Sequence, residues 1–182
     1  MKAKTYQTLE EARRALLIKL KAWTASTEKS IRVNSDIVRL EVNVKQAHPL
    51  EWLTLQDSSR KVFWENRSQT EQFAGIGSAL EVKDGKDGYE KILLTVSDYL
   101  QNSPKAVRFF GGMRFDSKAL TSTEWQDWGT AHFTLPMVEL SIVTEKAVLA
   151  CHIYYGENIH EKLLLMQKIL ETVRVEEISI PD

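Results

Sequence analysis

The sequence contains a single cysteine and almost no net charge, and both shortages exclude whole classes of protein. Cys151 has no second cysteine with which to form an internal disulfide, which fits a reducing compartment. Lysine and arginine total 24 and aspartate and glutamate total 25, so the formal net charge is -1 at pH 7. No long-range electrostatic field therefore draws the chain toward nucleic acid or anionic lipid.

Long apolar segments are also missing. The first residues, MKAKTYQTLEEARR, contain no apolar core of a signal peptide, and no run of about 18 apolar residues occurs anywhere. The sequence therefore predicts neither secretion nor a membrane span, and the cytoplasm is the simplest location. A length of 182 residues with 43% hydrophobic and 27% charged content is typical of one globular domain.

Three amphipathic helices are predicted. The first begins at Thr8, which has the capping-box spacing to Glu11, and its apolar positions recur at helical intervals to about residue 25. The second covers residues 89–100, before Pro104. The third follows Asn158, which with Glu161 has the same capping spacing.

Strands are predicted in seven segments, separated by glycine, proline and charged turns. They cover residues 31–44, 61–65, 73–81, 107–115, 131–135, 138–143 and 147–155, and the first of them is either a long strand or a hairpin. Several follow one another without an intervening helix, which favours the α+β class, with a mixed or antiparallel sheet flanked by helices. The adjacent Gly111 and Gly112 indicate a bulge or bend, and we expect a side chain at position 112 to clash there.

Few residues have the spacing of a chemical site. Gly75 and Gly77 begin like a dinucleotide-binding fingerprint, but Leu80 occupies the place of its third glycine. His132, His152 and His160, with Cys151, lack the i,i+4 and C-x-x-C relations typical of zinc sites.

Residues with reactive or stacking side chains suggest two further hypotheses, a nucleophilic cysteine and an RNA-binding strand. Cys151 could be a nucleophile with His132 or His152 as its base, but its apolar surroundings in the sequence favour a buried, inert thiol. Residues 108–115 combine arginine, glycine and aromatic residues as an RNA-binding strand does. That pattern requires glycine in second place and an alternating aromatic face, whereas here Gly111 and Gly112 are adjacent. The tryptophans Trp125 and Trp128 are more typical of core or sheet packing than of a ligand-binding platform. The adjacent carboxylates of Glu176 and Glu177 are typical of a solvated surface.

Several sequence motifs together resemble, in order and spacing, the N-terminal region of isochorismate synthases. They are PLEWL at 49–53, KVFWENR at 61–67, GIGSA at 75–79, RFFGGMRFD at 108–116, Trp125 with Trp128 and Gly129, and FTLPMVEL at 133–140. Related salicylate and anthranilate synthases share this general plan, but the tryptophan-feedback phrase of the anthranilate type is absent. The phrases around Trp52 and Trp64 look more like the menaquinone type.

The resemblance implies that the chemistry lies outside this chain. In that family a lysine activates water, a glutamate serves as general acid, and glutamates hold magnesium, all in a later chorismate-binding half. We therefore expect no catalytic, cofactor-binding or metal residue here, and magnesium only in the full-length parent. Residues 1–175 are expected to form the N-terminal non-catalytic region, and residues 176–182 the start of a linker to an absent chorismate-binding half.

The expected partners follow from the same resemblance. They are the C-terminal chorismate-binding half and, for the isolated chain, a second copy, because strands 107–115, 131–135 and 138–143 would expose apolar edges. No nucleic acid or membrane is expected as a partner. Two other functions remain open, namely a stand-alone small-molecule binding or regulatory module that lost the catalytic half, and a nucleic-acid-binding α+β domain.

Overall fold

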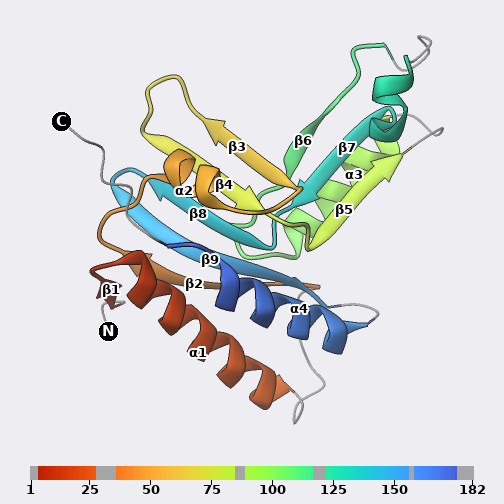
Figure 1. Ribbon diagram of the computed structural model, residues 1–182. Coiled ribbons are helices and arrows are strands. Elements are labelled where there is room, and N and C mark those ends of the chain that lie inside the picture. The colour runs from red at the N-terminus through yellow and green to blue at the C-terminus, as the bar shows by residue number, and fades with distance from the viewer. Residues whose placement is uncertain (1–3, 28–35, 85–88, 117–121, 156–157, 176–182) are drawn as a thin grey trace.

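The computed structural model describes residues 4–27, 36–84, 89–116, 122–155 and 158–175 (Figure 1). Its α-helices are α1 (Leu9–Thr27), α2 (Pro49–Leu55), α3 (Tyr89–Gln101) and α4 (Ile159–Thr172), and a 3-10 helix, η1, covers Thr123–Trp128. Its strands are β1 (Thr5–Tyr6), β2 (Ile37–Val44), β3 (Lys61–Glu65), β4 (Glu71–Ile76), β5 (Leu80–Asp84), β6 (Phe110–Met113), β7 (Ala131–Leu135), β8 (Val138–Val143) and β9 (Lys146–Tyr154).

The strands form two sheets. The large sheet has the order β1-β2-β9-β8-β4-β3, and the small sheet has the order β5-β7-β6. All neighbours are antiparallel except β1 and β2, which are parallel. The predicted α+β class with a mixed or antiparallel sheet flanked by helices is confirmed.

Two short connections link the sheets. Residues 77–79 separate β4 from β5, and Gly77 adopts a φ of 66°, a left-handed conformation that favours glycine. Pro136 and Met137 separate β7 from β8 in the same region. The prediction of one strand over residues 73–81 is therefore wrong, because the chain turns at Gly77 and enters the second sheet.

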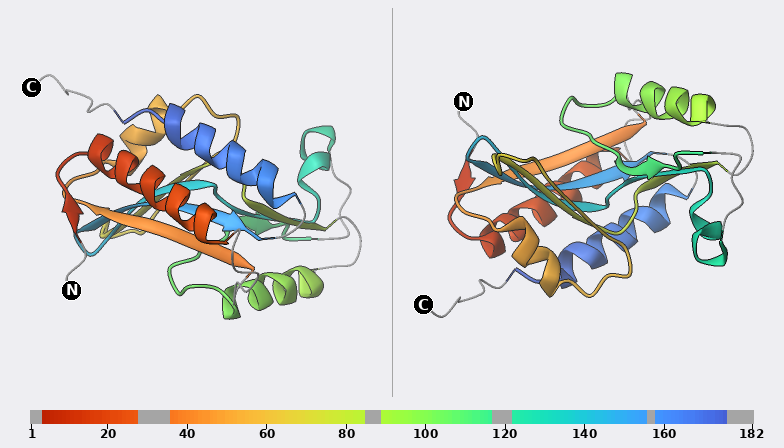
Figure 2. Two further views of the ribbon diagram at one scale, coloured as in Figure 1. Left: turned by 90° about the horizontal axis from the view of Figure 1, so that it is seen from below. Right: turned by 90° about the horizontal axis from the view of Figure 1, so that it is seen from above.

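The main core lies between one face of the large sheet and the helices α1 and α4, which lie side by side on that face (Figure 2). Leu16 of α1 and Leu170 of α4 are fully buried against Leu140 and Leu149 of the sheet. Arg13 ties the two helices together, because its guanidinium donates hydrogen bonds to the carbonyl oxygens of Leu170 and Glu171 at the end of α4. Helix α3 lies on the opposite side of the molecule and packs on the small sheet.

The N-terminal caps predicted for α1 and α4 differ in how far the structure agrees with them. At α1 the Glu11 amide donates to the Thr8 hydroxyl and the Gln7 amide donates to the Glu11 carboxylate, which confirms the predicted cap. At α4, Asn158 is the N-cap residue as predicted, but it adopts a left-handed φ of 59° and its side chain makes no capping hydrogen bond. Helix α2 was not predicted, because its seven residues are too few to show helical periodicity.

The glycine pair of β6 also differs from expectation. Residues 110–113 pair with residues 134–131 in a continuous register, without a bulge. A Cβ on Gly112 would meet no atom within 4 Å, whereas one on Gly111 would lie 1.9 Å from the His132 carbonyl oxygen. Gly111, and not Gly112, is the position that excludes a side chain.

Two expectations fall partly or wholly on residues outside the described ranges. They concern the start of the first strand, before residue 36, and the linker at 176–182. Among the strands expected to expose edges, β7 and β8 lie inside their sheets, so that prediction is wrong for them. Of those three, only β6 is at an edge.

Candidate functional site

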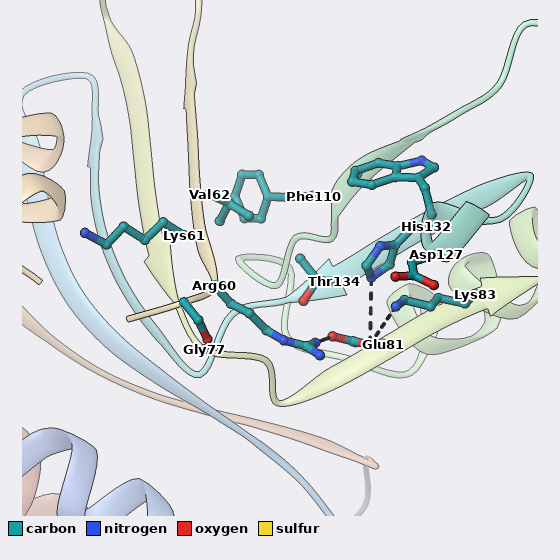
Figure 3. Close-up of a pocket in the computed structure, with 13 residues that line it drawn as sticks. Arg60, Lys61, Val62, Gly77, Glu81, Lys83, Phe110, Asp127, His132 and Thr134 are labelled. Carbon is teal, nitrogen blue, oxygen red and sulfur yellow. Dashed lines mark ion pairs between the residues drawn. The ribbon is translucent and has the colours of Figure 1, made fainter. Parts of the chain in front are cut away.

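A cleft of about 470 Å³ lies between the beginning of β3 and the small sheet (Figure 3). Val62 and the aromatic rings of Phe110 and Trp128 form its apolar walls. The strand order places β3 at the outer edge of the large sheet, and the turn at Gly77 brings the small sheet against it. The cleft therefore exists because the two sheets are built from one continuous chain that bends.

Glu81 is the centre of charge in this cleft (Figure 3). Its carboxylate forms an ion pair with Arg60, and lies 3.5 Å from Lys83 Nζ and 3.8 Å from His132 Nε2. Burial, together with the positive charges of Lys83 and Arg60, holds the pKa of His132 below its ordinary value. His132 is therefore neutral near pH 7, and the Glu81 carboxylate is engaged by cations of this same chain.

A second polar cluster is buried in the large sheet, on the face away from α1 and α4. Arg39 of β2 donates hydrogen bonds to Glu139 Oε1 of β8 at 3.1 Å and to His152 Nε2 of β9 at 2.7 Å. The His152 ring is fully buried, and its Nδ1 lies 2.9 Å from the Pro136 carbonyl oxygen. Because a carbonyl only accepts and a guanidinium only donates, His152 carries its hydrogen on Nδ1 and is neutral.

The charge balance of this cluster makes it a structural unit. Burial and the charge of Arg39 lower the pKa of His152 to about 3. Glu139 is fully buried, and its Oε2 has no hydrogen-bond partner among the described residues. The guanidinium of Arg39 compensates this carboxylate across three adjacent strands, and removal of either partner would leave a buried charge.

Sequence reasoning missed this cluster, although a signal was present. Glu139 stands within the apolar stretch of β8, whereas Arg39 and Glu41 occupy the regular polar positions of β2 between Val38, Leu40 and Val42. A charged residue at an inward position of a buried strand indicates a partner of opposite charge on a neighbouring strand.

The other candidate residues do not converge on a reactive centre. Cys151 points into the core under the helices, where burial raises the pKa of its thiol to about 12. His152 is the next residue of the same strand, and its side chain points to the opposite face. His160 lies in the first turn of α4, away from both. The prediction of an inert thiol agrees with this burial.

The glycine and arginine motifs have packing roles. A Cβ on Gly75 would lie 2.6 Å from Pro136 Cβ, so this glycine allows the connection between β7 and β8 to lie close against β4. The Arg108 guanidinium lies 4.3 Å from the centre of the Phe73 ring, and the Phe110 ring lies 6.1 Å from it. These groups pack on the buried Phe73 instead of forming an exposed platform for bases.

The comparisons with known proteins identify the family. Residues 21–179 match the family model described as chorismate binding enzyme. The chain belongs to this family. It is 23% identical over 180 residues to isochorismate synthase 2, chloroplastic, of Arabidopsis thaliana, in an alignment that covers 81% of this chain and 32% of that protein. It is 22% identical to the chloroplastic isochorismate synthase of Catharanthus roseus, with coverage of 76% and 31%.

The fold agrees with a solved member of the same group. The structure of MenF, the menaquinone-specific isochorismate synthase from Escherichia coli, superposes with a TM-score of 0.65 at 16% identity, covering 94% of this chain and 36% of that one. The chain thus spans about a third of the length of the curated relatives that it matches. The resemblance seen in the sequence is confirmed at the level of the family and its fold.

The described residues do not fit the magnesium site that the isochorismate synthase resemblance implies. Glu81 faces Arg60 and Lys83, and Glu139 faces Arg39, so these carboxylates are neutralised by side-chain cations. In the described ranges no three histidine, cysteine, aspartate or glutamate side chains come together in a way that could hold a metal ion. No helix in those ranges is long and apolar enough to span a membrane.

Proposed function

We propose that this chain is the N-terminal scaffold region of an isochorismate synthase. Its full-length form would isomerise chorismate to isochorismate, with menaquinone biosynthesis as the pathway. Residues 1–175 would form the non-catalytic region and residues 176–182 the beginning of the linker to a chorismate-binding half. The single observation that carries the proposal is the family match over residues 21–179 in a chain that spans about a third of its relatives.

The chemistry of the described side chains supports the same assignment. Isomerising a dicarboxylate requires an acid, a base and a cation that converge on one pocket. In the cleft, the Glu81 carboxylate is ion-paired with Arg60 and lies 3.5 Å from Lys83 Nζ, so cations of this chain already engage it. In the buried cluster, Arg39 is hydrogen-bonded to both Glu139 and His152, and all three side chains are buried, so they are closed to a substrate. We therefore place the catalytic groups and magnesium of the parent enzyme in the chorismate-binding half.

Association with a separately produced chorismate-binding half tests the proposal. Sedimentation velocity of the two polypeptides, alone and mixed, should show a complex, and the mixture should convert chorismate in the presence of magnesium. Failure of a folded catalytic half to bind the chain would favour a stand-alone small-molecule binding module instead.

A further inference from the structure

Strand β3 ends the large sheet, and one of its edges has no neighbouring strand among the described residues. Its sequence is Lys61-Val62-Phe63-Trp64-Glu65. Phe63 and Trp64 are large apolar side chains with exposed fractions of 37% and 46%. An unpaired edge of this kind can accept another strand.

The backbone of β3 presents alternate residues to this free edge. On the other edge, the Gly77 amide donates to the Arg60 carbonyl and the Asn66 amide donates to the Glu71 carbonyl. In an antiparallel ladder the residues bonded to one neighbour alternate along the strand, so the even-numbered residues of β3 bond to β4. The amide and carbonyl groups of Lys61, Phe63 and Glu65 therefore point outward.

These outward groups are self-complementary. If two copies of β3 pair antiparallel about Phe63, Phe63 lies opposite its own copy and Lys61 lies opposite Glu65 at both ends. All three positions are those with outward backbone groups, so each pair can exchange both of its backbone hydrogen bonds. On the other face of the strands, Val62 then lies opposite Trp64.

The charges of the strand are available for this pairing. Glu65 accepts hydrogen bonds from the amide groups of Gln69 and Gln72, which are neutral. No ion pair within the described part of the chain involves Lys61 or Glu65. The two charges lie four residues apart on one strand, which spans about 13 Å and is too long for them to bind each other.

The other sheet edges lack this complementarity. β1 has two residues, and β6 contains Gly111 and Gly112, which offer no side chains to pair. β5 would place Leu80 opposite Asp84 in a pairing with its own copy. β3 is thus the edge on which pattern, charge and backbone direction agree.

We propose that β3 is a homodimerisation strand, through which two copies of this chain join their large sheets antiparallel about a two-fold axis at Phe63. The contact is isologous, because each residue meets its partner's counterpart in the same way. This inference does not rest on the proposed function, because it uses only the edge geometry of β3.

Reversing the charges of Lys61 and Glu65, singly and together, tests the pairing. Residues with only a structural role would not recover dimerisation in the double variant. Sedimentation velocity over a concentration series should show a reversible dimer of the unmodified chain. Lys61→Glu and Glu65→Lys each place like charges opposite each other at both ends, so each should raise the dissociation constant about tenfold. The double variant restores opposite charges and should return the constant to within about threefold of the original.

Two further variants control this experiment. Lys168→Glu makes the same change in net charge on the exposed surface of α4 and should leave the dimer unchanged. Phe63→Pro removes an outward amide without touching the ladder to β4, so it should abolish dimerisation while the monomer keeps its fold by circular dichroism. A monomeric unmodified chain, a double variant as weak as the single ones, or a Phe63→Pro dimer would each overturn the proposal.

Discussion

The adjacent residues Gly111 and Gly112 show how finely position decides the role of a glycine. They lie in one strand and in one continuous register, yet a Cβ on Gly111 would meet the His132 carbonyl oxygen and one on Gly112 would enter open space. The sequence pointed to the glycine pair, but the prediction placed the steric clash at Gly112 and not at Gly111. The alternation of the strand faces, which decides between the two, depends on pairing partners that the sequence does not specify.

Alanine substitution at these two glycines should have unequal effects. Gly111→Ala forces two paired strands apart, so the free energy of unfolding should fall by about 1–3 kcal/mol. Gly112→Ala is the matched control and should change it by less than about 0.5 kcal/mol, or increase it, since alanine loses less backbone entropy than glycine. Denaturant unfolding of both variants measures the difference. Equal losses would show that the close approach at Gly111 is absent.

The buried His152 makes stability depend on pH. Its pKa of about 3 in the folded chain lies well below the ordinary value near 6.5, because the ring is buried beside Arg39. Below pH 6.5 the unfolded chain therefore binds a proton that the folded chain does not. The contribution of His152 to the free energy of unfolding is fully present above this pH. It falls as the pH decreases toward 3, by up to about 1.4 kcal/mol per pH unit.

Unfolding measured between about pH 5 and 7.5 isolates this effect, because carboxylates titrate mainly below that window. His152→Gln should reduce the slope by close to one proton. His132→Gln should reduce it less, since His132 is more exposed and the pKa of its ring is lowered by a smaller burial. Identical slopes for the unmodified chain and His152→Gln would contradict the assignment of a neutral, buried imidazole.

At the scale of whole elements, sequence patterns located the long helices well. α1 and α3 carry apolar residues at helical spacing along their full length, and Thr8 and Glu11 supply a local start signal for α1. α2 has only seven residues and holds its place through the buried Trp52 and Leu53. Tertiary packing, and not local periodicity, makes it helical, and for this reason the sequence did not predict it.

The α1 cap gives a prediction with a control of the same chemistry. Thr8→Ala removes the hydroxyl that accepts from the Glu11 amide, so the free energy of unfolding should fall by about 1 kcal/mol. In α3 the Thr95 hydroxyl donates to the Lys91 carbonyl within the helix. Thr95→Ala should be neutral or slightly stabilising, because alanine has the higher helix propensity. Thermal or denaturant unfolding of the two variants distinguishes cap loss from propensity.

The ends of the strands were harder to predict from the sequence than the ends of the long helices. The break of residues 73–81 into β4 and β5 depends on the left-handed Gly77 and on the packing of Pro136 against Gly75. Neither is visible without knowledge that β7 and β8 run beside these strands. The same bend creates the cleft between β3 and the small sheet, so the cleft could not be predicted either.

At the scale of the whole molecule, the family was readable from combined phrases while the site was not. Residues 61–67 and 75–79 lie together in β3, β4 and the turn that joins the sheets. The network of Arg39, Glu139 and His152 joins three strands that are distant in sequence. Only strand pairing brings these residues together, so the sequence shows no more than the one charged residue, Glu139, within an apolar strand.

The central claim is that this scaffold contains no complete active site, and its turnover of chorismate tests that claim most directly. The purified chain should produce no isochorismate above the uncatalysed background, with or without magnesium, when products are separated by chromatography. Magnesium-dependent turnover by the purified chain would contradict the account, and its loss in a folded Glu81→Gln variant would place the acid in this chain.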